Sequence, residues 1–456
     1  MVVGEVARPV DVLVIGGGPG GYTAAARAAE LGKEVVLVEE AALGGVCLNV
    51  GCIPSKALIT VACDLQRARA GERWGVRGTP TLDFAATQRW KSEVVDGLAR
   101  GVGQLLRRVE VVSGTARFLD AHRVAVESGE QVAHFRFDDA VIATGSRPVA
   151  LADLPVDGAR VTDSSGALSF AEVPRTLAVV GGGYIGVELG MAYAKLGARV
   201  TIVEALDRIL AGFDADLVRE VERAAGKLGI DLRTRTLAKG IDGDDLVVTS
   251  GDGTETVPAE RVLVAVGRQP NTDDLQLDQA GVQPGVDGRL QVDAQRRTAV
   301  ANLYAVGDVT AGPALAHKAM AEGVVAAEAI VGLPAGFDQV VPLIAFTDPE
   351  LASVGVTEEE ARAQGQEVVV GRARFTASGR AATLSDQRGF VKLVVDAGSG
   401  VLLGVGLVGT AVTDLVGEAA LAVETAARAE DLAATVHPHP TLAEILGDAA
   451  RAAVRR

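Results

Sequence analysis

The clearest pattern along the chain is an alternation of apolar and polar stretches that occurs twice. Residues 11–39 read DVLVIGGGPGGYTAAARAAELGKEVVLVE, and residues 176–204 read TLAVVGGGYIGVELGMAYAKLGARVTIVE. Each begins with a short apolar run, passes through a glycine-rich turn into a segment with helical periodicity, and closes with a second apolar run ending in Glu. This order predicts a strand–helix–strand unit, the start of a Rossmann-type sheet. We therefore expect two dinucleotide sites, or one site and a copy that has lost its ligand.

Three later apolar runs predict further strands: AVIATGSRP (140–148), RVLVAVGRQPNT (261–272) and NLYAVGDVT (302–310). We expect the first two to be the closing strands of the two nucleotide-binding domains, ended by Pro148 and Pro270, because proline cannot donate to a sheet ladder.

The pattern changes beyond Pro342. There, strand-like runs at 389–396 and 400–409 alternate with alanine-rich helical segments, which predicts a separate mixed domain. The expected division of the α/β chain is 1–148, 149–270, 271–341 and 342–456.

Length and charge narrow the function classes. A chain of 456 residues suggests about three or four domains. The formal net charge of −15 argues against a nucleic-acid binder, which would need a basic surface. The apolar stretch 401–412 is too short and too glycine-rich to cross a membrane, and the N-terminus lacks the pattern of a signal peptide. We expect a cytoplasmic protein.

The two glycine motifs have the residues that a dinucleotide site requires. In the first, Gly16 allows the tight turn, Gly18 lets the backbone approach a pyrophosphate, and Gly21 lets the helix pack on the strand. Glu39, at the end of the second strand, can accept hydrogen bonds from a ribose 2′-hydroxyl. The alternative is a strand–turn–helix that binds no ligand.

The second motif repeats this arrangement with Gly181, Gly183 and Gly186, followed by Glu204. A carboxylate at that position repels a 2′-phosphate, although Arg208 lies close by. The motif therefore favours NAD over NADP.

Cys47 and Cys52 are two of only three cysteines, the third being Cys63. In an ideal helix, Cα atoms five residues apart lie about 8–9 Å from one another, whereas a disulfide requires less than about 7 Å. The segment must therefore be distorted, and Gly51 supplies the freedom. Metal binding is the main alternative, but no histidine or second cysteine pair lies nearby in the sequence. A redox-active pair is favoured.

His437 and His439 occur in HPHPTLAE, with Glu444 five residues after His439. An enzyme that handles thiols needs a base that titrates near neutral pH, and histidine with a carboxylate partner is the natural one. A surface loop with two incidental histidines remains an equal alternative on spacing alone.

Together these motifs resemble the pyridine nucleotide–disulfide oxidoreductase family. The resemblance runs through GGVCLNVGCIPSKAL, IATGSRP, GGGYIGVELG, VGRQPNT, YAVGDV, LAHKA, FTDPELASVG and HPHPTLAE, in the family order. Within the family the chain looks closest to the flavoprotein component of 2-oxo-acid dehydrogenase complexes. That enzyme oxidises protein-bound dihydrolipoamide through a disulfide and FAD and reduces NAD⁺.

The resemblance implies that the four predicted parts are an FAD domain, an NAD domain, a central domain and a C-terminal dimerisation domain. It implies catalytic roles for Cys47, Cys52, His439 and Glu444. The residues implied at FAD are Gly16, Gly18, Gly21, Glu39, Lys56, Ala116, Asp308 and Ala316. Those implied at NAD are Gly181, Gly182, Gly183, Tyr184, Ile185, Gly186, Glu188, Glu204, Val266 and Gly267, with Glu188 and Lys56 paired beside the flavin. No residue is implied as a metal ligand.

The implied partners are a second copy of the chain, which lends His439 to the neighbouring cysteines, and the lipoyl-bearing acyltransferase core of the complex. Neither a nucleic acid nor a membrane is implied. Two alternatives remain: another disulfide reductase of the family, acting on glutathione or a similar thiol, and a flavoprotein that serves mainly as a docking subunit.

Overall fold

The computed structural model describes residues 7–251 and 253–454, which form two compact units. Of these described residues, the first unit contains 7–57, 85–149 and 267–338. The second unit contains 58–84, 150–251, 253–266 and 339–454. The division into four parts predicted above is finer and stays a prediction.

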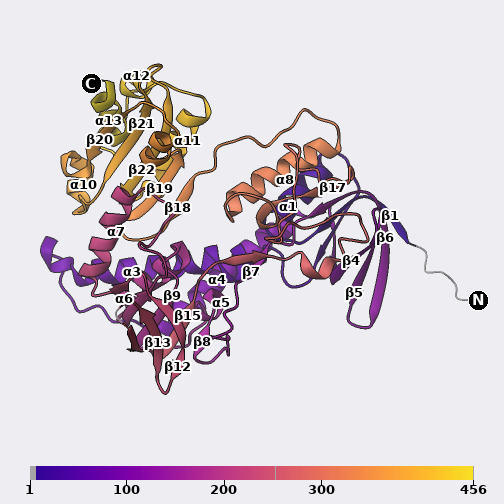
Figure 1. The fold of residues 1–456 in the computed structure, drawn as a ribbon, viewed down its shortest axis with the longest axis horizontal. Coiled ribbons are helices and arrows are strands. Elements are labelled where there is room, and N and C mark those ends of the chain that lie inside the picture. The colour runs from indigo at the N-terminus through magenta and orange to yellow at the C-terminus, as the bar shows by residue number, and fades with distance from the viewer. Residues whose placement is uncertain (1–6, 252, 455–456) are drawn as a thin grey trace, which may run out of the picture. The chain divides into compact units, whose positions relative to one another are not determined.

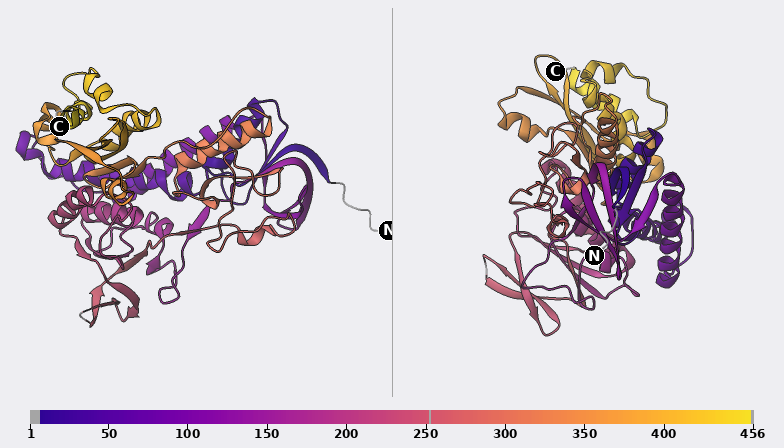
Figure 2. Two further views of the ribbon diagram at one scale, coloured as in Figure 1. Left: turned by 45° about the horizontal axis from the view of Figure 1, so that its top comes forward. Right: turned by 90° about the vertical axis from the view of Figure 1, so that its right-hand side faces the viewer.

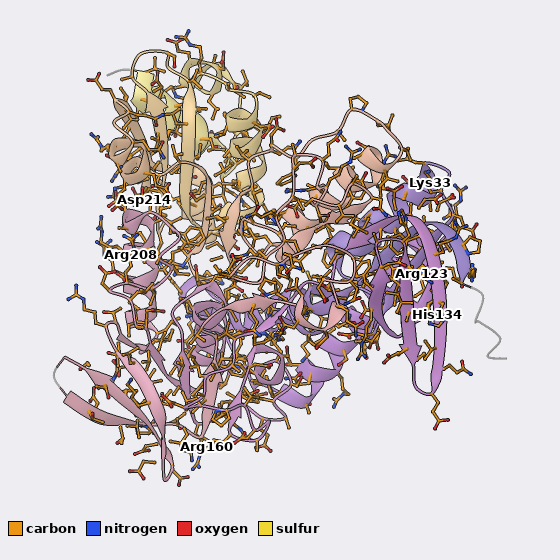
Figure 3. The ribbon with its side chains drawn as sticks, turned by 45° about the vertical axis from the view of Figure 1, so that its right-hand side comes forward. Lys33, Arg123, His134, Arg160, Arg208 and Asp214 are labelled. Carbon is orange, nitrogen blue, oxygen red and sulfur yellow. The ribbon has the colours of Figure 1, made fainter. Side chains whose placement is uncertain are left out.

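The first unit is built on a mixed sheet in the order β3-β2-β1-β6-β5-β4, with β17 beside β6. Strands β1 and β2 are parallel and joined by α1, as the first repeat predicts. The strands are β1 (Arg8–Ile15), β2 (Val35–Glu39), β3 (Glu110–Ser113), β4 (Thr115–Asp120), β5 (Arg123–Ser128), β6 (Gln131–Ile142) and β17 (Leu303–Ala305). Arg123 and His134 mark the antiparallel β5–β6 hairpin at one end of this sheet (Figure 3).

The helices of this unit include α1 (Pro19–Glu30), α2 (Gly45–Val50), α4 (Phe84–Leu105) and α8 (Ala316–Ile330). Helices α1 and α8 lie side by side (Figure 1). Their contact is close because it is made by small residues: a Cβ added at Gly323 would lie 2.5 Å from the carbonyl oxygen of Gly20.

The second unit contains the other strand–helix–strand repeat in a parallel sheet of order β11-β10-β9-β15-β8. Its elements are β8 (Val161–Thr162), α5 (Ser164–Ala167), β9 (Thr176–Val180), α6 (Tyr184–Leu196), β10 (Arg199–Val203), α7 (Ala215–Lys227), β11 (Asp231–Arg233) and β15 (Arg261–Val264). An antiparallel meander of β12 (Leu237–Asp242), β13 (Asp245–Ser250) and β14 (Gly253–Pro258) packs on this sheet through Leu246, Val248 and Val257 (Figure 2). Arg208 and Asp214 follow β10 on the way to α7 (Figure 3).

The C-terminal part of the second unit is the predicted mixed domain, an antiparallel sheet of order β18-β19-β22-β21-β20. Its strands are β18 (Leu343–Ala345), β19 (Glu350–Gly355), β20 (Val368–Arg374), β21 (Phe390–Asp396) and β22 (Leu402–Gly409). Its helices are α9 (Glu358–Ala363), α10 (Gly379–Leu384), α11 (Val412–Glu424), α12 (Ala429–Ala434) and α13 (Glu444–Val454). Helices α11, α12 and α13 share a hydrophobic core with the sheet (Figure 1).

The segments at 140–148 and 261–272 differ from the expected single strands. Strands β6 and β15 end at Ile142 and Val264, before the prolines. The chain then forms a second pair of short strands, β7 (Ser146–Pro148) and β16 (Arg268–Pro270), which pair antiparallel with each other. Pro148 and Pro270 end this ribbon rather than the strands of the two larger sheets.

One segment of the described chain, Gly45–Arg69, is long and apolar enough to cross a membrane by length and composition alone. It is not one continuous helix, because α2 ends at Val50 and α3 (Cys52–Arg69) begins after Gly51. Leu58, Ala62 and Leu65 of α3 pack in a hydrophobic core, as the buried helix of a globular protein does.

Candidate active site

The two cysteines lie on either side of a helix break. Cys47 is in α2, and Cys52 is the first residue of α3. Gly51 between them has φ −137° and ψ −107°, and a Cβ there would lie 2.8 Å from the carbonyl oxygen of Val46. Only glycine fits, so Gly51 provides the distortion that the cysteine spacing requires.

The cysteine side chains contact each other as thiols. The hydrogen bond with Cys52 and then burial raise the pKa of the Cys47 thiol, while the positive charge of Lys56 acts in the opposite direction. Two thiols in contact lose their protons in two separate steps, because the first thiolate opposes ionisation of the second. In the reduced pair, the raised pKa of Cys47 favours the protonated form of that thiol.

The redox segment rests directly on the first glycine loop. The Gly44 amide donates to the carbonyl oxygen of Gly17 at 2.8 Å, and a Cβ on Gly45 would lie 2.7 Å from the Cα of Gly18. The Asn49 amide group holds the turn by donating to the carbonyl oxygens of Leu43 at 3.0 Å and Gly45 at 2.9 Å. The cysteines are thus adjacent to the loop that is predicted to bind a pyrophosphate.

The two glycine loops have the same backbone geometry. Gly16 and Gly181 have φ of 103° and 111°, which side-chain-bearing residues rarely adopt. A Cβ on Gly21 or Gly186 would lie 1.8 Å or 2.0 Å from the carbonyl oxygen of the first glycine of its loop. The glycines are therefore required by close backbone approach, as expected from the sequence.

Both loops fit a bound pyrophosphate. The N-cap residues of α1 and α6 are Gly18 and Gly183, and neither supplies a side-chain cap to the first-turn amides. Beside Gly183 a Cβ would meet no atom of the described chain within 4 Å, and beside Gly18 it would meet only the Cα of Gly45, at 4.0 Å. Open space at an uncapped helix N-terminus accommodates a phosphate group, which the amides and the helix dipole stabilise.

Glu39 and Glu204 close their own glycine loops. Glu39 accepts hydrogen bonds from the amides of Gly17 at 2.6 Å and Ala41 at 2.8 Å. Glu204 accepts in the same way from Gly182 at 2.6 Å and Leu206 at 2.7 Å. The sequence predicted a ribose-binding role and not this one. The roles are compatible, because a carboxylate accepts about four hydrogen bonds.

Asp308 lies in the short turn Gly307–Val309, and two residues of other motifs hold its carboxylate. The Ser146 hydroxyl donates to Asp308 Oδ2, and Arg268 Nε lies 4.0 Å from the same oxygen. Arg268 also donates to the Ser146 hydroxyl oxygen at 2.8 Å. Sequence reasoning missed Ser146 and Arg268, although both lie in recognised motifs, IATGSRP and VGRQPNT.

The other residues predicted at FAD are part of the first unit. Ala116 is buried in β4, Ala316 begins α8, and Lys56 is partly buried in α3. Their predicted contacts with a flavin stay predictions.

All but one of the residues predicted at NAD belong to the second unit, on or near α6. Tyr184 and Ile185 form its first turn, and Val266 follows β15 with 40% of its surface exposed. Glu188 is only 3% exposed and accepts from the Phe346 amide at 2.8 Å. It therefore joins α6 to the FTDPELASVG segment. Gly267, with φ of 138°, belongs to the first unit, as does Lys56.

His439 and Glu444 form the predicted pair. His439 Nδ1 lies 2.9 Å from Glu444 Oε1, and the Thr441 amide donates to Glu444 Oε2 at 2.9 Å. The hydrogen bonds from His439 and then Thr441 lower the pKa of Glu444. The His439 side chain is 77% exposed, so its Nε2 edge can meet a group from outside the unit.

His437, two residues earlier, is different. Its Nε2 lies 2.8 Å from Glu418 Oε1, and its side chain is only 7% exposed. Among residues 7–251 and 253–454, no three His, Cys, Asp or Glu side chains are grouped as a metal site would require.

The comparisons with known proteins agree with this geometry. Residues 10–323 match the family model described as pyridine nucleotide-disulphide oxidoreductase, and residues 341–450 match the dimerisation domain of the same family. The chain belongs to the pyridine nucleotide–disulphide oxidoreductase family. The predicted α/β fold class and the predicted class of flavin-dependent disulfide oxidoreductase are confirmed.

Relatives extend over the full chain. The chain is similar to a dihydrolipoyl dehydrogenase of Geobacillus stearothermophilus, with 47% identity over 100% of this chain and 98% of the relative. A dihydrolipoyl dehydrogenase of Halobacterium salinarum is also 47% identical, with the same coverage. Among solved structures, LpdA from Mycobacterium tuberculosis superposes with a TM-score of 0.91 at 28% identity, covering 97% of this chain and 99% of that one.

Proposed function

We propose that the chain is a dihydrolipoyl dehydrogenase that oxidises protein-bound dihydrolipoamide to lipoamide and reduces NAD⁺ to NADH. The observation that carries the proposal is the placement of Cys47 and Cys52, in mutual contact and packed against the first glycine loop. Full-length similarity to dihydrolipoyl dehydrogenases supports the choice of substrate.

The first unit supplies the FAD site. Gly16, Gly18 and Gly21 would hold the pyrophosphate, Glu39 would accept a hydrogen bond from a ribose hydroxyl, and Asp308 would contact the ribityl chain or the phosphates of FAD. Lys56 adds a positive charge beside the flavin. When bound, FAD accepts the electron pair of the reduced cysteines and passes it to the nicotinamide as hydride.

The second glycine loop supplies the nicotinamide dinucleotide site. The family implies NAD or NADP, and the acidic side chain supports NAD. Glu204 stands at the end of β10 with its carboxylate held by two amides. That fixed negative charge repels a 2′-phosphate and accepts from a 2′-hydroxyl.

The dithiol reaction uses the cysteines and His439. His439, oriented by Glu444, accepts a proton from one substrate thiol. The substrate thiolate attacks Cys47 Sγ, which forms a mixed disulfide, breaks the Cys47–Cys52 bond and releases Cys52 as a thiolate. The second substrate thiol then displaces Cys47 and closes the lipoyl disulfide, and its proton passes to the Cys47 sulfur as that group leaves. Two electrons have now moved from the substrate to the cysteine pair.

The dimerisation domain supports a homodimer. The exposed His439 of one protomer then reaches the cysteines of its partner, so each site needs both copies. We further propose that the enzyme is cytoplasmic and docks on the lipoyl-bearing acyltransferase core of a 2-oxo-acid dehydrogenase complex.

The decisive test is a spectral titration of the purified holoenzyme with dihydrolipoamide, followed by NAD⁺. We expect a long-wavelength thiolate–flavin band that appears with the dithiol and disappears with NAD⁺. Glutathione disulfide with NADPH is the matched comparison. Turnover of that pair, without turnover of dihydrolipoamide, would assign the chain to another branch of the family, and no redox turnover at all would leave only a docking role.

A further inference from the structure

A group of buried charges lies behind the turn that carries Asp308. Glu322 and Lys318 of α8 have side chains that are 0% and 3% exposed, and the side chain of Arg296 is 10% exposed. None of the three residues belongs to the glycine motifs or the redox segment. Burying charges requires strong compensating contacts, and apolar residues of similar volume usually stabilise a fold as well or better. The burial of these three charges therefore indicates a role other than stability.

Glu322 uses both carboxylate oxygens. Its Oε1 lies 2.8 Å from Arg296 Nη1 and 2.9 Å from Lys318 Nζ. Its Oε2 accepts from the Gly307 amide at 2.6 Å, and the Thr310 hydroxyl lies 3.3 Å from each oxygen. The carboxylate thus connects α8 to the backbone at the start of the Gly307–Val309 turn.

Lys318 also contacts this turn, through a carbonyl and a hydroxyl oxygen. Its ammonium group donates to the Gly307 carbonyl oxygen at 3.2 Å and to the Thr310 hydroxyl oxygen at 3.0 Å. Both backbone groups of Gly307 are therefore anchored by α8, and Gly307 itself has φ of 80°. A turn held in this way has little freedom to move Asp308, the next residue.

Asp308 is a second anion close to this group of charges. Arg296 and Lys318 are cations, and Glu322 is one anion. Burial lowers the pKa of Lys318, whereas Glu322 and, more weakly, Asp308 raise it. Asp308 is itself held by Ser146 and is near Arg268. The turn is therefore fixed on one side through its backbone and on the other through the Asp308 carboxylate.

We propose that Glu322 is a positioning residue of the flavin site, holding Gly307 and Lys318 so that Asp308 faces the FAD. This inference rests on the proposed function, because it takes the ribityl chain or the phosphates of FAD to lie against Asp308. Glutamine at 322 would present an amide donor to a cluster of donors and would remove the negative charge that Lys318 and Arg296 need. The Asp308 turn would then become mobile or be drawn toward the two cations.

The test compares Glu322→Gln with Glu328→Gln in the full-length protein. Glu328 lies on the same helix, but it pairs with Arg27 at 2.7 Å and its side chain is 24% exposed. FAD is removed from each protein, and the dissociation constant is measured by titrating FAD back into the apoprotein. We expect at least a tenfold increase for Glu322→Gln, an altered visible flavin spectrum, and values within twofold of the wild type for Glu328→Gln.

Melting temperatures separate positioning from general stability. If Glu322 positions the flavin site, the stabilisation that FAD adds to the apoprotein should shrink in Glu322→Gln. If it only supports the fold, the apo and holo forms should lose stability equally and the FAD dissociation constant should stay unchanged. That second result would overturn the proposal.

A milder variant covers the case in which Glu322→Gln does not fold. Thr310→Val keeps the volume and all three charges but removes the hydroxyl between Lys318 and Glu322. We expect a threefold or larger rise in the FAD dissociation constant, and wild-type affinity would overturn the proposal. These binding measurements are independent of dihydrolipoamide turnover. A wild-type enzyme that binds FAD but ignores dihydrolipoamide would instead contradict the proposed substrate.

Discussion

The two strand–helix–strand repeats have the same glycine loop but use their helices differently. In α1 the buried residues are glycine and alanine, and they allow close packing on α8. In α6 the buried residues include two that can carry a charge, Glu188 and Lys195. The loop geometry depends on local backbone contacts, whereas the face of the helix depends on what the rest of the fold places against it.

Two charged side chains of α6 contact the same neighbouring segment. Glu188 accepts from the Phe346 amide, and Lys195 Nζ lies 2.5 Å from Asp348 Oδ2. Burial alone would raise the pKa of Asp348, but the cations of Lys195 and Arg388 outweigh it and lower that pKa. The helix that serves the proposed NAD site is therefore attached to the dimerisation domain at two points.

The two repeats differ in the segment that follows their second strand, and the largest expected loss of activity comes from changing that segment in the first repeat. The redox segment comes after β2, whereas the described residues between β10 and α7 include no cysteine. We predict that Cys47→Ser lowers dihydrolipoamide turnover by about 10³-fold or more, with FAD still bound. Cys63→Ser, which changes the third cysteine, should stay within about twofold of the wild type. Substantial activity in Cys47→Ser would reject the redox pair.

The ion pairs that hold α6 and α1 should contribute differently to the stability of the protein. Removing one partner of a buried ion pair costs about 3–5 kcal/mol, so Lys195→Met should lower the free energy of unfolding of the second unit by that order. Arg27→Met breaks the more exposed pair with Glu328 and should lower the free energy of unfolding much less, because exposed ion pairs contribute little. Chemical denaturation measures both. Equal effects would show that the two helices are anchored alike.

The same comparison has a pH dependence. The pKa of Asp348 is lowered in the folded state. Its ion pairs therefore add their full contribution to the free energy of unfolding above the ordinary pKa of aspartate. This contribution is lost as the pH falls through the lowered pKa. The stability difference between the wild type and Lys195→Met should therefore shrink on acidification. A difference that grows toward low pH would contradict this assignment.

The two histidines provide a comparison within the C-terminal domain. His439→Gln should slow the dithiol half-reaction by about 10²-fold or more, the usual effect of losing a general base. His437→Gln should have a much smaller effect, because that ring is buried against Glu418. Since the pKa of Glu444 is lowered, its carboxylate should support His439 until the pH falls below the ordinary glutamate range. Stopped-flow reduction with dihydrolipoamide would measure each rate.

The smallest expected effect is on the KM for NAD⁺, and it distinguishes the roles of the two glycine loops. Gly183→Ala places a methyl group in open space at φ −70°, so the protein should fold normally. The methyl group would occupy the proposed pyrophosphate position and raise the KM for NAD⁺ about tenfold, the lower end of an overpacking effect. FAD content should not change. Loss of FAD with unchanged NAD⁺ binding would mean that the two sites have been assigned in reverse.

Much of the fold was predictable because it depends on local patterns. The two repeats, the strands near 390–409 and the glycine turns lie where the apolar runs and the spacing indicate. The closing segments were only partly right, because no apolar pattern distinguishes one long strand from two short ones separated at Ala143–Gly145. The roles of the predicted site residues toward FAD, NAD and substrate stay predictions.

The sequence by itself determined the chemistry that is available: a distorted cysteine pair, two phosphate-binding turns, a histidine with a carboxylate and an acidic strand end. These depend on residues that are close along the chain, so spacing and backbone sterics define them. Only the tertiary structure decided which distant groups meet, such as Ser146 and Arg268 with Asp308, Glu188 with Phe346, and Lys318 and Glu322 with Gly307. Such contacts depend on how sheets and helices pack, and no local pattern encodes the partner of a buried charge.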